Sequence, residues 1–93
     1  LLNVKKNMEK AIEYFEMAAD QDHLDALYNL GYIYENGIDV EIDERAAIYY
    51  YETAADLGDS SSIQALIRIY SEGKIVERDD LMAQRWRRKL KFG

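Results

Sequence analysis

The stretch that decides the fold is AIEYFEMAADQDHLDALYNLGYIYENGIDVE, residues 11–41. It recurs without a gap at a shift of 36 positions as AIYYYETAADLGDSSSIQALIRIYSEGKIVE, residues 47–77. When residues 7–42 are aligned with residues 43–78, 13 of 36 positions are identical, and many hold alanine, tyrosine or glycine where packing or turns restrict the residue type. A repeat of this length indicates a protein built from stacked copies of one structural unit.

Each copy is predicted to contain two helices. Residues 7–20 place apolar side chains one helical turn apart, which is the spacing of an amphipathic helix. The same spacing recurs along the chain and predicts about five helices, at residues 7–20, 24–36, 43–57, 61–72 and 79–91. We therefore expect residues 1–93 to form a single all-α repeat domain, with units at residues 7–42, 43–78 and a partial unit at 79–93.

Residues at the predicted helix ends support these bounds. An asparagine or aspartate precedes three of the apolar stripes, where its side chain can accept a hydrogen bond from the first helical turn. These expected N-caps are Asn7, Asp43 and Asp79. Gly37 and Gly73 follow two of the helices, and the absence of a Cβ allows the left-handed conformation that ends a helix.

Small and aromatic residues indicate how the helices approach one another. The alanine pairs at 18–19 and 54–55, together with Gly31, leave room for a neighbouring helix. In the connectors, Val40 and Val76 are expected to tuck under the helix pairs. The aromatic side chains that are expected to pack between helices are Tyr14, Phe15, Tyr34, Tyr50, Tyr51, Tyr70 and Trp86.

Two motifs carry a resemblance to a known family. They are Ala26-x3-Leu30-Gly31-x2-Tyr34-x2-Gly37 and Asp43-x3-Ala47-x2-Tyr50-x3-Ala54-Ala55. With these spacings, residues 7–91 resemble the Sel1-like repeat family, a relative of the tetratricopeptide repeat. The second copy departs from the family pattern at Ser62 and Ile67, where the family has Ala and Gly, and the last, partial copy has Leu90-Lys91 where the Ala-Ala pair would stand. The resemblance implies an α-solenoid of antiparallel helix pairs in a right-handed superhelix, acting as an adaptor or scaffold.

The resemblance also implies which surface meets a partner. In tetratricopeptide-like stacks the first helix of each unit lines the concave side, which here assigns residues 24–36 and 61–72 to that side. The expected partner-binding residues at positions outside the core are Tyr28, Tyr32, Glu35, Asn36, Gln64, Arg68, Ser71 and Glu72. Aromatic surface beside amide and guanidinium groups suits an extended peptide, and an ordinary solvated face is the alternative. We expect Tyr28→Ala or Arg68→Ala to weaken binding with little effect on melting.

The charge of the chain is divided between its two parts. The formal net charge is −6, from 12 basic and 18 acidic residues, and it divides into −9 over residues 1–78 and +3 over residues 79–93. The basic run that could dock electrostatically onto an acidic partner or a second copy contains Arg85, Arg87, Arg88 and Lys89. The alternative is a polar end-cap helix in which Ala83, Trp86 and Leu90 face the stack.

The composition argues against several classes of function. The absence of cysteine excludes disulfides, thiol catalysis and cysteine-ligated zinc. His23 is the only histidine and is expected to be a turn or cap residue, and no phosphate loop, nucleophile elbow or calcium loop occurs. We therefore expect no enzyme activity, no cofactor and no metal. The acidic balance argues against nucleic acid, and no apolar run approaches the ~20 residues that membrane insertion needs.

Three functions remain open on the sequence. The first is a protein-interaction scaffold or adaptor that binds a peptide or protein through its concave helix surface. The second is a structural segment of a longer or self-associating solenoid, and the third is a regulator of a partner enzyme. The compartment is undetermined, although the lack of cysteine and of a visible signal peptide slightly favours a cytoplasmic location.

Overall fold

The computed structural model describes residues 9–14, 16–17, 23–73 and 77–93. Its helices include α2 (Leu24–Asn36), α3 (Glu44–Asp56), α4 (Ser60–Glu72) and α5 (Asp80–Phe92). Residues 9–14 and 16–17 are also helical, and none of the described residues lies in a strand. The prediction of an all-α fold is therefore confirmed, while both ends of the helix predicted at 7–20 lie outside the described residues.

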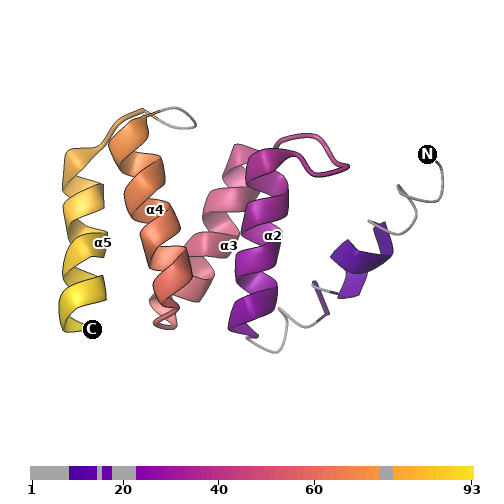
Figure 1. The fold of residues 1–93 in the computed structure, drawn as a ribbon, viewed down its shortest axis with the longest axis horizontal. Coiled ribbons are helices and arrows are strands. Elements are labelled where there is room, and N and C mark those ends of the chain that lie inside the picture. The colour runs from indigo at the N-terminus through magenta and orange to yellow at the C-terminus, as the bar shows by residue number, and fades with distance from the viewer. Residues whose placement is uncertain (1–8, 15, 18–22, 74–76) are drawn as a thin grey trace.

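The helices stack into an elongated solenoid with extents of 42 × 28 × 14 Å. Consecutive helices run in opposite directions (Figure 1). α3 packs against α2 and α4, and α4 packs in turn against α5. Because α3 passes behind α2 and α4 in Figure 1, the two flanking helices share one face of the molecule.

Aspartate side chains start three of the helices. Asp43 and Asp79 each accept a hydrogen bond at 3.0 Å from the backbone N–H three residues later, which confirms both as N-caps. Asp59 starts α4 in the same way and also accepts a bond of 2.6 Å from the Ser62 hydroxyl. Ser62 is fully buried, so this bond satisfies the hydroxyl that stands where the first copy has Ala26. The expected cap Asn7 lies outside the described residues.

Glycine ends α2 and α4 as predicted. Gly37 has φ 64° and Gly73 has φ 66°, which is the left-handed conformation that side chains with a Cβ rarely adopt. A Cβ on Gly37 would in addition lie 2.7 Å from Cγ1 of Ile42. The chain can therefore turn sharply at both places and send the next helix back along the stack.

The core consists of two clusters of buried side chains. The smaller cluster joins Ile12 to Leu30 and Ile33 of α2, with Val40 packed against it as predicted. The larger cluster joins α3, α4 and α5 through Ala47, Tyr51, Ala55, Ile63, Ala65, Leu66, Ile69 and Trp86. Phe15, Val76 and the alanine pair at 18–19 lie outside the part of the chain whose side chains are described.

Gly31 makes room for a side chain rather than for a neighbouring backbone. A Cβ at this position would lie 2.6 Å from Cε1 of Tyr51, whose ring is fully buried. The aromatic packing prediction is confirmed for Tyr51 and Trp86, whereas Tyr14 differs because it remains 67% exposed. A fully buried tyrosine ring thus packs against a residue that has no side chain.

Candidate functional site

The face shared by α2 and α4 contains a hollow of about 320 Å³. Tyr28 lines it from α2, and Ser61, Gln64, Ala65 and Arg68 line it from α4. Tyr28, Gln64 and Arg68 were predicted to lie on the concave side, and the fold brings these three side chains together around one space. Ser61 stands at a position outside the core as well, whereas Ala65 is a buried core residue that forms the floor.

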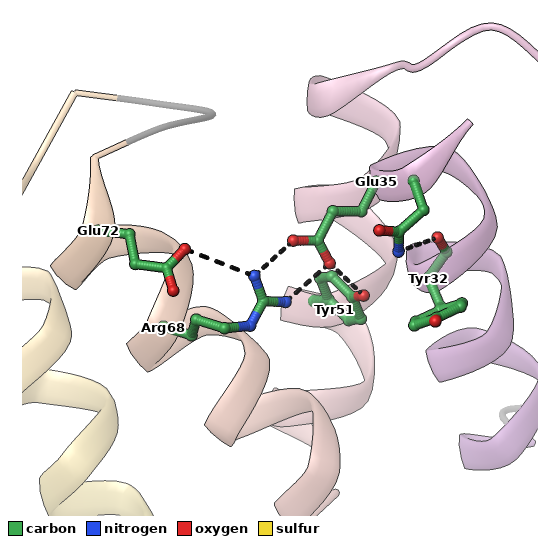
Figure 2. A network of polar contacts seen from close by, with 6 residues as sticks. Tyr32, Glu35, Tyr51, Arg68 and Glu72 are labelled. Carbon is green, nitrogen blue, oxygen red and sulfur yellow. Dashed lines mark hydrogen bonds and ion pairs between the residues drawn. The ribbon is translucent and has the colours of Figure 1, made fainter. Parts of the chain in front are cut away.

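Beside the hollow, Glu35 and Arg68 form an ion pair that joins α2 directly to α4 (Figure 2). Arg68 donates from Nη1 to Glu35 Oε2 at 2.7 Å and from Nη2 to Oε1 at 2.8 Å, so the pair is bidentate. The Tyr51 hydroxyl donates a third bond to Oε1 at 2.8 Å, which brings α3 into the same network. Nη1 of Arg68 also lies 3.9 Å from Oε2 of Glu72, one turn further along α4.

Glu35 does not lie outside the core, and this part of the sequence prediction was wrong. Its side chain is only 6% exposed, because the last turn of α2 directs it toward α3 and α4. Three hydrogen bonds from two residues satisfy the carboxylate and make its burial tolerable. Sequence reasoning also missed the polar role of Tyr51, which stands 36 positions after Phe15 and differs from it by the hydroxyl.

The network holds its three members in fixed protonation states. Burial by itself would raise the pKa of Glu35, but the hydrogen bonds from Arg68 and Tyr51 outweigh it, so the pKa is lowered from the ordinary 4.5. The hydrogen bond to Glu35 raises the pKa of Arg68. Burial, followed by the bond to Glu35, raises the pKa of Tyr51. Near neutral pH the carboxylate and guanidinium are therefore charged and the phenol is neutral.

Tyr28 lines the hollow and also packs against the core. Its ring lies 5.7 Å from that of Tyr51 and 6.5 Å from that of Tyr32, centroid to centroid. Tyr32 itself is exposed beside the hollow, one turn further along α2. These contacts predict that Tyr28→Ala, and likewise Arg68→Ala, would lower stability as well as alter the surface, in contrast to the expectation from the sequence.

The remaining predicted residues lie at the C-terminal ends of α2 and α4. Asn36 is exposed and donates from Nδ2 to the carbonyl oxygen of Tyr32 at 2.9 Å. Glu72 is exposed, and Ser71 is half-buried. The Ser71 hydroxyl accepts a bond of 3.1 Å from Nη2 of Arg87 in α5. Asn36 and Ser71 are thus occupied by contacts within the chain.

The basic run at 85–89 lies on α5. Arg85, Arg87 and Arg88 are exposed and Lys89 is half-buried. Ala83 and Trp86 are buried on the opposite side of the helix, whereas Leu90 is 40% exposed and faces the stack only in part. This arrangement agrees with a polar end helix and leaves the three arginines accessible to water.

A comparison between copies shows which positions have become polar in α5. In α3, Ile48, Tyr51 and Ala55 pack against the cluster that α4 completes. The positions 36 residues later are Gln84, Arg87 and Lys91, which are all exposed. The side of α5 that would receive another helix by analogy with α3 is therefore hydrophilic.

The described residues do not assemble a centre for metal chemistry. Among them, no group of three or more His, Asp or Glu side chains is placed to hold a metal ion. His23 occupies the N-cap position of α2 without a capping hydrogen bond from its side chain. Within the same part of the chain, no helix combines the length and apolar character needed to cross a bilayer.

Comparisons with known proteins agree with this fold. The Sel1 repeat model matches residues 1–23, 24–59 and 65–89. The crystal structure of a Sel1 repeat protein from Oxalobacter formigenes is similar over 88% of this chain and 34% of that one, with 32% identity and a TM-score of 0.79. A protective antigen of uropathogenic Escherichia coli strains that displays an SLR fold is similar over 86% and 17%, with 31% identity and a TM-score of 0.78.

Each match covers most of this chain but only a minor part of the solved structure. The chain spans 34% and 17% of the two solved structures, so it corresponds to a part of each. Curated protein sequences give no match. The family matches extend from residue 1 to residue 89 with only one short gap, and the copies stack as helix pairs along a solenoid. The chain belongs to the Sel1 repeat family.

Proposed function

We propose that this chain is a protein-interaction module that binds an extended segment of a partner protein across the face formed by α2 and α4. Sel1 repeats are generally protein–protein interaction modules and scaffolds rather than catalysts. A solenoid of this kind presents continuous helical surface, because each unit packs only against its neighbours. The residues that would carry the binding are Tyr28, Tyr32, Gln64, Arg68 and Glu72.

The hollow between α2 and α4 is the observation that carries this proposal. Its volume of about 320 Å³ lies within the range that ligand pockets occupy. An aromatic ring from α2 stands on one side, with serine, amide and guanidinium groups from α4 on the other. Aromatic area combined with adaptable hydrogen-bonding groups is typical of surfaces that recognise peptides.

Peptide selection on the immobilised chain tests the proposal. A displayed library of random peptides about ten residues long would be enriched on the wild-type chain and on two variants. We expect Gln64→Ala, at an exposed position in the hollow, to reduce the binding of selected peptides at least about fivefold. The matched control Gln84→Ala removes an exposed glutamine from α5 and should bind like wild type. Equal binding by all three chains would contradict the proposal.

A second candidate function is electrostatic docking through α5, either to an acidic partner or between copies. The accessible Arg85, Arg87 and Arg88 favour it, because the rest of the chain carries the opposite sign of charge. Light scattering of the chain between about 50 and 500 mM NaCl tests association between copies. Association that weakens with salt and is lost in an Arg85→Gln/Arg88→Gln variant would support docking through this surface, whereas salt-independent behaviour would oppose it.

A further inference from the structure

Several polar groups that border the hollow have no hydrogen-bond partner within the described part of the chain. Among the residues that the structure describes, no hydrogen bond engages the Tyr28 hydroxyl, the Ser61 hydroxyl or the Gln64 side-chain amide. Arg68 uses only Nη1 and Nη2 toward Glu35, so Nε–H also lacks a partner within this part of the molecule. The residues that carry these groups all line one hollow, so a ligand in it could reach them.

The chemistry of the unpartnered groups matches a peptide backbone. A glutamine side chain has one carbonyl acceptor and an NH₂ donor, so Gln64 can pair with the N–H and C=O of a single residue in an extended strand. The Ser61 hydroxyl can donate or accept. The Arg68 edge that points away from Glu35 only donates, which suits a carbonyl oxygen.

The two helices that form this face carry a net negative charge in spite of Arg68, and Arg87 of α5 reaches the edge of the face at Ser71. α2 and α4 together contain the acidic residues Asp25, Glu35 and Glu72 and the single basic residue Arg68. Glu35 neutralises Arg68 through two hydrogen bonds of 2.7 and 2.8 Å, and Glu72 lies 3.9 Å from the same guanidinium. A carboxylate that entered the hollow would therefore meet an already compensated cation and an additional negative charge.

We propose that the partner of this face is an extended segment whose residue in the hollow is uncharged and which carries Lys or Arg next to it, on the side of Glu72, and that the face rejects acidic segments. Gln64 and Arg68 hold the backbone of the segment, and Glu72 attracts its cation. This assignment of the partner rests on the proposed function. Glu72 is exposed, so it can approach a basic side chain without a large cost of desolvation.

The peptides selected on the wild-type chain test the inference through their composition. We expect Lys and Arg to be enriched and Asp and Glu to be depleted, each at least about threefold relative to the library. Selection on Glu72→Gln should lose most of this enrichment, because the variant keeps the shape of the side chain and removes its charge. Glu41→Gln, an exposed acidic position in the connector after α2, is the matched control and should select the same peptides as wild type.

Binding constants of one selected peptide then locate the charge contact. Replacing its basic residue by glutamine should weaken binding about three- to tenfold on the wild-type chain and less than about twofold on Glu72→Gln. Circular dichroism of each variant confirms that the helices are retained.

The outcomes separate this inference from the proposed function on which it rests. Peptides that depend on Gln64 but show no basic preference, or an acidic one, would overturn the inference and leave the proposed function standing. Peptides that bind equally to Gln64→Ala would overturn both. Loss of peptide binding as the chain self-associates at rising concentration would identify a second copy as the occupant and would also overturn the inference.

Discussion

The substitution Glu35→Gln tests whether the buried network holds the repeats together. The variant keeps the size of the side chain and removes the negative charge to which Arg68 and Tyr51 donate their hydrogen bonds. The carboxylate accepts three hydrogen bonds of 2.7 to 2.8 Å, and a hydrogen bond to a charged group contributes about 1.5–3 kcal/mol. Because the Arg68 side chain is 44% exposed, it can recover hydration when the pair is broken. We therefore expect a loss in the upper part of that range for one such bond, about 2–3 kcal/mol, rather than the sum of three bonds.

Thermal and urea unfolding followed by circular dichroism measure this loss. In a domain of this size each 1 kcal/mol lowers Tm by about 4–8 °C, so Glu35→Gln should melt at least about 8 °C below wild type. Glu44→Gln at an exposed position of α3 is a comparison in which little should change, within about 0.5 kcal/mol. A loss below about 1 kcal/mol for Glu35→Gln would refute the reasoning, because it would mean that the ion pair does not stabilise the contact between α2 and α4.

Three further results are expected from the packing, the caps and the titration. Gly31→Ala should cost about 1–3 kcal/mol in urea unfolding, because its Cβ would lie 2.6 Å from the Tyr51 ring, and a wild-type midpoint would show that the ring can move aside. Asp43→Ala should lower the free energy of unfolding by about 1 kcal/mol, because the Ala46 N–H loses its hydrogen-bond acceptor. Replacing an exposed aspartate that caps no helix by alanine should lower it by less. The stability that ionised Glu35 contributes should be complete above its ordinary pKa of 4.5 and disappear as pH falls through its lowered folded pKa, so wild type and Glu35→Gln should converge in acid.

The sequence predicts the helices well because their determinants are local. α2 begins and ends at the residues predicted, and Asp43, Asp79, Gly37 and Gly73 act at the ends of helices as expected. Each of these signals needs only a side chain and its own backbone within a few residues. The small shift at the start of α4 has the same kind of cause, since Asp59 supplies a cap that the apolar pattern alone does not reveal.

The site was predicted less well because its determinants cross between repeats. The helical pattern places Glu35 outside the apolar stripe, yet its partner Arg68 stands 33 positions later in another helix. Nothing in either local segment shows that the two residues will meet. Tyr51 is difficult to predict for a related reason. Its side chain both packs in the core and donates a hydrogen bond, and the sequence pattern indicates only the packing. Only the stacking of α2, α3 and α4 makes these three residues one unit.

The two copies solve one structural problem with different residues. The bond from Tyr51 to Glu35 connects the middle of α3 to the end of α2, and 36 positions later the bond from Arg87 to Ser71 connects α5 to α4. The first joint is buried and carries a negative charge that then captures Arg68 of the following helix. In the second joint the acceptor is the neutral Ser71, and the donor is the positively charged Arg87 of α5, which is exposed to water. Because Ser71 is neutral, the second joint contains no carboxylate that needs a compensating cation, in contrast to the first joint.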